Sequence, residues 1–269
     1  MANQYLLQKP AYMYPWEKRT LYLGRLPDAV RVAYGAATLL VSLGNPITVR
    51  IGNQCRRGIS FLIPAGTATL IDAGLQIVAV LHLDVLGDDC ARFDGCFQSS
   101  FQGETLMSEL KDEVDYRALL SRIYHQPCDS TQLYGQVDAL LEFSFNQVRV
   151  RSNPDPQIAA TVDLIKQRFQ DNIPIEELAE RVQLSTPSLI RRFKRQAGIP
   201  IRRFRLWHRI YESMIFISDG QNLTDAALNA GFSDSSHYTH TLQTMWGVTP
   251  SGLFTRDIRA EIVPPECRD

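Results

Sequence analysis

The second half of the chain repeats one hydrophobic pattern at an interval of about 49 residues. The first copy consists of Leu178, Ala179, Leu189, Phe193, Gly198 and Phe204, and the second of Ala226, Ala227, Tyr238, Leu242, Gly247 and Leu253. In each copy, two apolar residues spaced by four lie on one face of a helix, and the glycine five positions later ends that helix. A helix, a turn and a second helix at this spacing predict a helix-turn-helix unit, whose second helix fits the major groove of DNA.

Helix start and stop signals surround both units. We expect helices over 157–169, 175–182, 186–196, 201–217, 224–229 and 235–246. Pro174 suits the start of the second helix, because a first turn does not need the missing N–H. Ser185 and Asp234 are candidate N-caps, and Gly198 and Gly247 are candidate C-caps.

The charge of the chain is concentrated in one segment. The whole sequence has 28 Lys and Arg against 29 Asp and Glu, for a net charge of −1. The segment 181–211, however, contains nine basic residues and no acidic one. A solvated helix face is the ordinary explanation of a short basic run, but such a face usually carries interleaved acids. The run therefore favours a polyanionic partner.

The first half of the sequence predicts strands. Short aliphatic and β-branched runs occupy 38–43, 47–51, 59–63 and 75–85, and Gly, Asn and Pro separate them. This rhythm is typical of a small β-sandwich or barrel. The apolar period then becomes helical, which predicts helices over 104–124 and 130–145.

A polar segment with two prolines, 151–156, is the best candidate domain boundary. A chain of 269 residues is long enough for two small domains with cores of their own. We therefore expect an N-terminal domain over 1–150 and a C-terminal domain over 154–260.

Other features argue against a membrane or secreted protein. The longest apolar runs, such as 77–81, are far shorter than the roughly 18 to 20 residues that span a bilayer. The first residues lack a basic segment followed by an apolar one, and the five cysteines are scattered without a paired spacing. We expect a cytoplasmic protein with reduced thiols and no membrane contact.

The residues of the two units resemble the AraC/XylS family of transcription regulators. The resemblance covers 157–254 and is most specific in two segments, Gly231-Phe232-Ser233-Asp234-Ser235-Ser236 and Gly247-Val248-Thr249-Pro250. It implies an α+β protein: an N-terminal cupin-like β-barrel with following helices for sensing and dimerisation, then an all-α DNA-binding domain with two helix-turn-helix units. The partners it implies are double-stranded DNA, a small-molecule effector, RNA polymerase and a second copy of the chain.

The resemblance also assigns contacts with DNA. The family's base-reading positions fall on Pro187, Ile190, Arg191, Ser235, Ser236, Thr239 and His240. Arg191 is the expected direct reader, because its guanidinium matches O6 and N7 of guanine. Phosphate contacts are expected from Lys194, Arg195, Arg202, Arg203 and Arg205. Arg209 is expected to tie the two units together.

The first half offers little for chemistry. Its histidines are His82 and His125, so fewer than three candidate ligands of the cupin kind are present. This argues against a catalytic metal, another cofactor or an enzyme. A lone His82 in an apolar strand is more often a core residue than a ligand.

We expect the barrel to enclose a small apolar or amphipathic effector. The residues proposed to line its cavity are Trp16, Phe61, Leu62, Leu81 and His82. Two alternatives remain open: control by a protein partner with no small-molecule ligand, and a cupin-type enzyme fused to a DNA-binding module, which the missing ligands disfavour.

Dimerisation is expected through the helix over 104–124. Its stripe of Leu106, Leu110 and Leu119 has to be buried, either against the barrel or against a second chain. Because paired chains suit repeated half-sites on DNA, the sequence favours the second chain.

Overall fold

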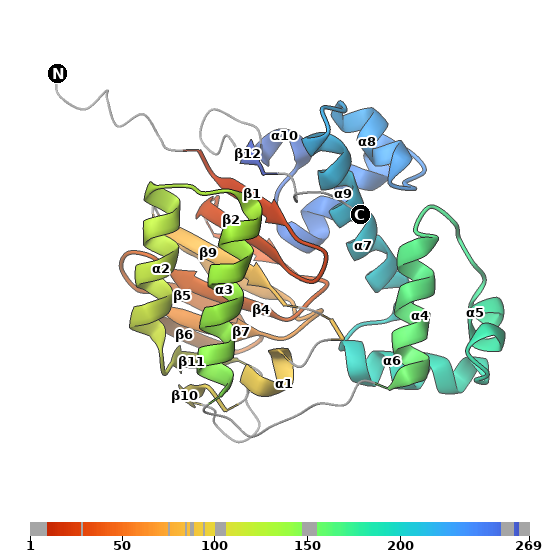
Figure 1. Ribbon diagram of the computed structural model, residues 1–269, viewed down its shortest axis with the longest axis horizontal. Coiled ribbons are helices and arrows are strands. Elements are labelled where there is room, and N and C mark those ends of the chain that lie inside the picture. Colours follow the sequence, from red (N-terminus) through yellow and green to blue (C-terminus); the bar gives the residue numbers. More distant parts are fainter. Residues whose placement is uncertain are drawn as a thin grey trace.

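The computed structural model describes residues 10–27, 29–74, 76–83, 85–86, 89–93, 95–99, 106–146, 155–253 and 261–263. The N-terminal half consists mainly of strands with helices on one side, and the C-terminal half consists of helices (Figure 1). This is the α+β arrangement that the sequence predicts.

The larger sheet contains eight strands within the described residues, in the order β10-β11-β7-β4-β9-β2-β1-β12. These strands are β1 (Tyr12–Pro15), β2 (Thr20–Arg25), β4 (Thr38–Ser42), β7 (Ser60–Ile63), β9 (Ile77–His82), β10 (Phe97–Ser99), β11 (Met107–Leu110) and β12 (Glu261–Ile262). Neighbouring strands are antiparallel, except that β12 runs parallel to β1. The central register places Leu40 of β4 opposite both Phe61 and Val80.

The smaller sheet has the order β3-β8-β5-β6 and packs over one face of the larger sheet. Its strands are β3 (Val30–Val32), β5 (Ile47–Ile51), β6 (Gln54–Gly58) and β8 (Thr69–Asp72). Val49 and Ile71 are fully buried between the sheets against Leu40 and Phe61. The predicted cupin-like domain is therefore present as two packed sheets, although within the described residues they do not close into a barrel.

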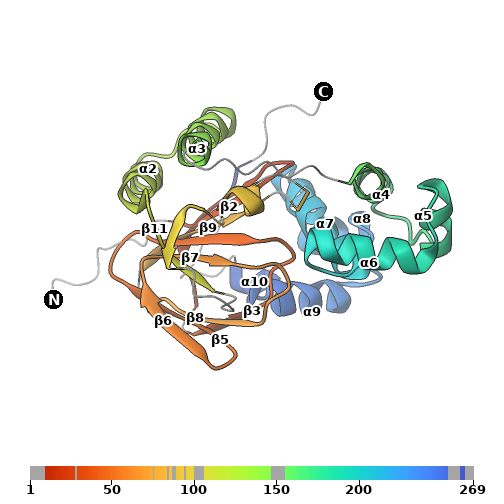
Figure 2. The same ribbon diagram turned by 90° about the horizontal axis from the view of Figure 1, so that it is seen from below.

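Helices cover the outer face of the larger sheet (Figure 2). They are α2 (Glu113–His125) and α3 (Ser130–Phe145), and the short α1 (Asp89–Phe93) lies at their edge. Because successive side chains of a strand point to opposite faces, Leu62 and Leu81 face these helices whereas Phe61 faces the smaller sheet. A buried Arg19 ties the β1–β2 turn to the same layer through ion pairs with Asp89 and Asp138.

The helix predicted over 104–124 is wrong in its first part. The structure has strand β11 at Met107–Leu110, and α2 begins only at Glu113. Because β11 pairs with β7 and β10, Leu106 is buried in the cluster between the sheets and Leu110 in the cluster under α2 and α3. Two residues of the predicted dimer stripe are thus internal, and Leu119 is partly buried against the same cluster as Leu110.

The helices of the C-terminal half lie where the sequence predicts them. They are α4 (Pro156–Gln167), α5 (Ile175–Arg181), α6 (Thr186–Ala197), α7 (Ile201–Ser218), α8 (Leu223–Asn229), α9 (Ser235–Trp246) and α10 (Pro250–Leu253). Gly198 and Gly247 end α6 and α9 in the left-handed conformation, with φ of 74° and 73°. Asp234 caps α9 with a side-chain hydrogen bond from the His237 amide, whereas Ser185 precedes α6 without such a bond.

The two halves share a core. Ile210, Met214 and Trp246 of the helices pack in one cluster with Val30 and Tyr34 of the first half. The chain then returns after α10 to place β12 beside β1, where the Glu261 amide donates to the Ala11 carbonyl (2.7 Å). The first helix-turn-helix unit has a separate core, in which Leu178, Leu189 and Phe193 are among the buried residues. Of the segment predicted as the boundary, 151–156, residues 151–154 lie outside the described residues, and Asp155 and Pro156 form the start of α4.

Candidate DNA-binding surface and interdomain cavity

The first recognition helix, α6, presents a polar face to solvent. Leu189 and Phe193 are fully buried, so the opposite side of the helix points outward. The predicted base-reading residues of this unit, Pro187, Ile190 and Arg191, are all exposed. Ile190 is unusual, because 47% of the surface of this apolar residue is accessible to solvent. An exposed isoleucine beside an arginine suits apolar contact with a base methyl group next to a hydrogen-bonded base edge.

The second recognition helix, α9, presents hydroxyl and imidazole groups. Its apolar side buries Tyr238 and Leu242, which leaves Ser235, Ser236 and His240 exposed and Thr239 partly exposed. The Asp234 carboxylate accepts from the His237 amide at 2.7 Å. This backbone hydrogen bond is the main reason why the pKa of Asp234 lies below its usual value, so the cap is ionised at neutral pH.

Arg209 of α7 connects the two units. Its Nε donates to the Phe169 carbonyl at 2.8 Å, in the loop between α4 and α5. Gly231, with φ of 85°, packs directly on this guanidinium, and a Cβ there would lie 3.1 Å from Nε. Gln170 completes the connection by donating to the Asn229 carbonyl at 2.7 Å. The role predicted for Arg209, a tie between the units, agrees with this geometry.

The five predicted phosphate residues do not share one environment. Lys194, Arg195 and Arg202 are exposed. Arg203 instead donates to the Ala33 carbonyl of the first half, and Arg205 donates to the Ile173 carbonyl. Burial lowers the pKa of both guanidinium groups.

Arg203 and Arg205 thus each use one terminal nitrogen within the protein, and both residues stay partly exposed, so their assignment to phosphates remains a prediction. The sequence shows that these residues are charged but not which way their side chains point, and α7 packs against other elements on several sides.

A basic cleft lies between α6, the start of α7 and α9. It encloses about 610 Å³, and its lining includes Lys194, Arg202, His237 and His240. No acidic side chain lines it among the described residues. The N-terminal half reaches its edge at Gly66, which packs against Ile199. The cleft thus joins the exposed faces of both recognition helices through cationic groups.

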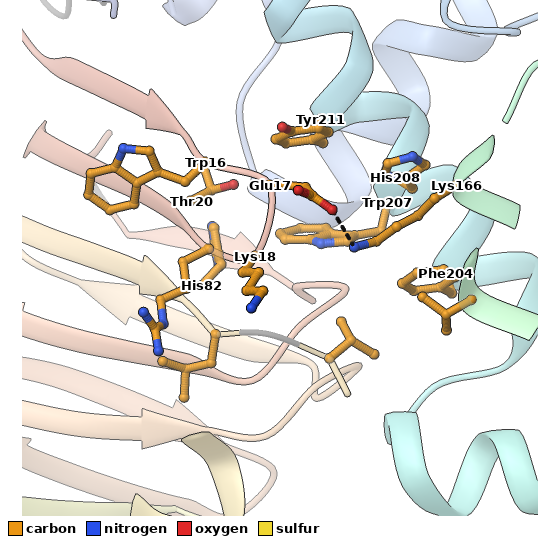
Figure 3. Close-up of a pocket in the computed structure, with 14 residues that line it drawn as sticks. Trp16, Glu17, Lys18, Thr20, His82, Lys166, Phe204, Trp207, His208 and Tyr211 are labelled. Carbon is orange, nitrogen blue, oxygen red and sulfur yellow. Dashed lines mark ion pairs between the residues drawn. The ribbon is translucent and has the colours of Figure 1, made fainter. Parts of the chain in front are cut away.

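A second cavity lies between the two halves (Figure 3). Trp207, His208 and Tyr211 line it from α7, and Trp16 and Lys18 line it from the β1–β2 turn. Lys166 of α4 reaches across to Glu17, with Nζ 3.9 Å from Oε1. The cavity has a volume of about 50 Å³, which is room for a few water molecules, so a larger ligand requires side chains to move.

His82 stands at the centre of the contact between the halves. It is 2% exposed, and its ring lies 4.7 to 5.0 Å, between centroids, from those of Tyr34, Trp207 and Trp246. Its Nδ1 lies 2.8 Å from the Thr38 hydroxyl oxygen, which is also 3.1 Å from the Ala36 carbonyl oxygen. Burial lowers the pKa of His82 to about 3. The residue is neutral and part of the core.

The residues predicted to line an effector site are not brought together. Trp16 and His82 line the interdomain cavity. Phe61 lies between the two sheets, and Leu62 and Leu81 lie under α2 and α3. Because side chains alternate between the two faces of β7 and β9, these residues point to different sides of the sheet. The sequence does not predict the lining residues on α7, because spacing in the sequence does not reveal contacts between distant helices and strands. No group of three or more His, Cys, Asp or Glu side chains in the described residues stands close enough to hold a metal ion.

Residues 178–256 match the family model of a helix-turn-helix domain. The transcriptional activator RhaR of Pectobacterium atrosepticum is 28% identical over 167 residues, which are 59% of this chain and 57% of that protein. The activator RhrA of Rhizobium meliloti is 27% identical over 122 residues, 42% of this chain and 37% of that protein. The chain thus spans about half the length of the curated relatives it matches.

Solved structures of ToxT from Vibrio cholerae resemble the whole fold. The structure with a bound unsaturated fatty acid has a TM-score of 0.57 and 14% identity, and covers 89% of this chain and 96% of ToxT. A ToxT structure without ligand gives the same TM-score. The fold and the helix-turn-helix match define a two-domain protein with a paired helix-turn-helix module. The resemblance to the AraC/XylS family is confirmed, and the chain carries the helix-turn-helix domain of that family.

No helix in the described part of the chain combines the length and apolar character that a membrane span requires.

Proposed function

We propose that this protein is a sequence-specific DNA-binding transcription regulator. The observation that supports this most directly is the pair of recognition helices, α6 and α9, whose exposed faces carry Arg191 and a row of hydroxyl groups and are held together through Arg209. A rigid pair of this kind can enter two successive major-groove segments on one side of a duplex. The names of the matched relatives, which are transcriptional activators, support the same function. RNA polymerase is the further partner that we propose.

Selection from a random duplex pool tests this function. Full-length protein should enrich one sequence with two short blocks, and binding to it should exceed binding to a scrambled duplex by roughly 10³-fold or more. Arg191→Ala should lose preference for one base pair, and Arg50→Ala, an exposed change on β5, should bind as the wild type does. Enrichment of no sequence would contradict the proposal.

We also propose that the interdomain cavity is the effector site. Aromatic rings of α7 face the β1–β2 turn there, and Lys18 and Lys166 bring two cationic groups to it. These walls suit a flat or elongated apolar ligand with an acidic group, which would take Lys166 from Glu17. Structures of ToxT contain an unsaturated fatty acid and (E)-4-(8-methylnaphthalen-1-yl)but-3-enoic acid, and these ligands guide the choice of candidates.

A thermal-shift screen of apolar carboxylic acids tests the effector site. A ligand should raise the melting temperature of the wild type, and Lys166→Ala should weaken this shift while Arg50→Ala preserves it. A shift that Lys166→Ala leaves unchanged would place the ligand elsewhere. If no acid shifts the protein, control by a protein partner becomes the better explanation.

A further inference from the structure

The candidate arginines of α6 fall into two environments. Arg191 and Arg195 are exposed, whereas the side chain of Arg192 is only 27% exposed. Adjacent residues of a helix point about 100° apart, so Arg192 can face the body of the unit while Arg191 faces solvent. The pattern of charges in the sequence does not show which of these arginines faces solvent and which faces the protein.

Arg192 is held by a set of hydrogen bonds rather than by one. Its Nε donates to Asp155 Oδ2 at 2.7 Å, and the terminal nitrogen Nη2 forms an ion pair with the same oxygen. Its other terminal nitrogen donates to Gln157 Oε1 at 2.7 Å. Because the guanidinium is planar and all three of its nitrogens are engaged, these bonds fix its orientation.

The partners of Arg192 are themselves fixed to other helices. Asp155 Oδ1 caps α4 by accepting from the Gln157 amide at 3.1 Å, and the Asp155 amide donates to Gln196 Oε1 at 3.2 Å. Gln157 Nε2 donates to the Val182 carbonyl at 2.8 Å, directly after α5. Arg192 and Gln196 are one turn apart on α6, so they hold one side of this helix against the start of α4 and the end of α5.

We propose that Arg192 is a positioning residue, which sets the rotation of the first recognition helix about its axis and makes no contact with DNA phosphates. The inference rests on the proposed DNA-binding function and names the residue that aims Arg191. Desolvation raises the pKa of Asp155, but the hydrogen bonds from Arg192 and from backbone amides outweigh this and hold it below its usual value. The pair is therefore fully charged at neutral pH.

Binding titrations over a salt series separate positioning from phosphate contact. The probe is the duplex selected by the wild type, with a scrambled duplex for comparison. Arg192→Ala should weaken binding to the selected duplex roughly tenfold, the size of one lost base contact, and should leave binding to the scrambled duplex and the salt slope unchanged. Arg195→Ala, the matched control on the same helix, should weaken both duplexes and reduce the slope by about 0.9. A reduced slope for Arg192→Ala would overturn the proposal.

Two further variants guard against simple unfolding. Arg192→Lys keeps the charge but lacks the planar fork, and Asp155→Asn keeps the shape but lacks the carboxylate. Both should lose discrimination in the same direction as Arg192→Ala, and the double variant R192D/D155R should recover part of it. Wild-type discrimination in all of these variants would overturn the proposal.

Amide hydrogen exchange on the full chain tests positioning without DNA. Arg192→Ala should accelerate exchange at the start of α4 and along α6 and leave α9 unchanged. If the wild type selects no duplex, the proposed function fails, and the exchange result still decides whether Arg192 holds α6. Unchanged exchange in α6 would show that it does not.

Discussion

At the scale of single residues, burial decides the role of each candidate. Residues 191 and 192 are both arginines, yet Arg191 is exposed to solvent whereas Arg192 is hydrogen-bonded to Asp155 and Gln157. His82 is likewise buried among aromatic rings, and this burial lowers its pKa and keeps the imidazole neutral. The sequence could predict that these side chains matter, but not what surrounds them, because their partners lie far away along the chain.

The two recognition helices are expected to contribute unequally. Arg191→Ala should cost about 1 to 3 kcal/mol at the selected duplex and remove discrimination at one base pair, most directly a guanine. Ser236→Ala should cost less, because it removes a single hydroxyl contact. Titrations of both variants against the selected and scrambled duplexes measure this. A greater loss of specificity for Ser236→Ala or His240→Ala would reverse the ranking of the helices.

The buried His82 makes stability depend on pH. Its pKa of about 3 in the folded protein lies below the unfolded value of about 6.5, so the unfolded chain binds a proton first. Its contribution to the free energy of unfolding is therefore complete above pH 6.5 and falls by about 4 kcal/mol as the pH approaches 3. His82→Phe should flatten the loss of melting temperature between pH 7 and pH 4.5. Parallel profiles for the two proteins would contradict this.

At the scale of helices and strands, the sequence predicts the C-terminal half well and the N-terminal half less completely. Period, caps and glycine stops are local signals, and they placed α5, α6 and α9 within one or two residues. Besides β11, the sequence does not predict strands β1, β2, β3, β6, β8, β10 and β12, because short strands are stabilised by pairing with strands that are distant in the sequence. The apolar period around Leu106 and Leu110 fits a helix, but pairing with β7 makes a strand.

The placement of β11 changes the expected outcome of a dimer test. Leu110→Asp should unfold the N-terminal half, because Leu110 is 2% exposed in its core. Val114 is 77% exposed on α2 and Phe143 is 56% exposed on α3, so the proposed homodimer would use this outer face. If the wild type sediments as the expected dimer, V114D/F143D should stay folded and sediment as a monomer. A dimer that survives this change would place the interface elsewhere.

At the scale of the whole molecule, the two halves are joined more closely than their sequences indicate. The proline-rich boundary suggests separable domains, yet Trp246 and Met214 pack with strands of the first half, and β12 joins the larger sheet. Of the two helix-turn-helix units, the first has a buried cluster built from residues of the C-terminal half, against which Ala65, Val85 and Leu86 of the first half pack. Contacts of this kind are set by tertiary packing and leave no periodic signal in either half.

The shared core predicts how an isolated C-terminal half behaves. A fragment of residues 154–269 should keep the helical circular dichroism of α4 to α6, because their core is internal. Hydrogen exchange in α9 should be faster than in the full chain, because Trp246 and Met245 lose their cover. Equal protection of α9 in the fragment and in the full chain would show that the second unit is independent.

Footprinting on the selected duplex tests the central claim, that two linked recognition helices read DNA together. Full-length protein should protect two blocks on one face of the duplex, about one helical turn or 10 base pairs apart. Inserting about five base pairs between the blocks should abolish specific binding, because Arg209 and the shared core hold the helices at a fixed separation. A single protected block, or binding that tolerates the insertion, would contradict the account.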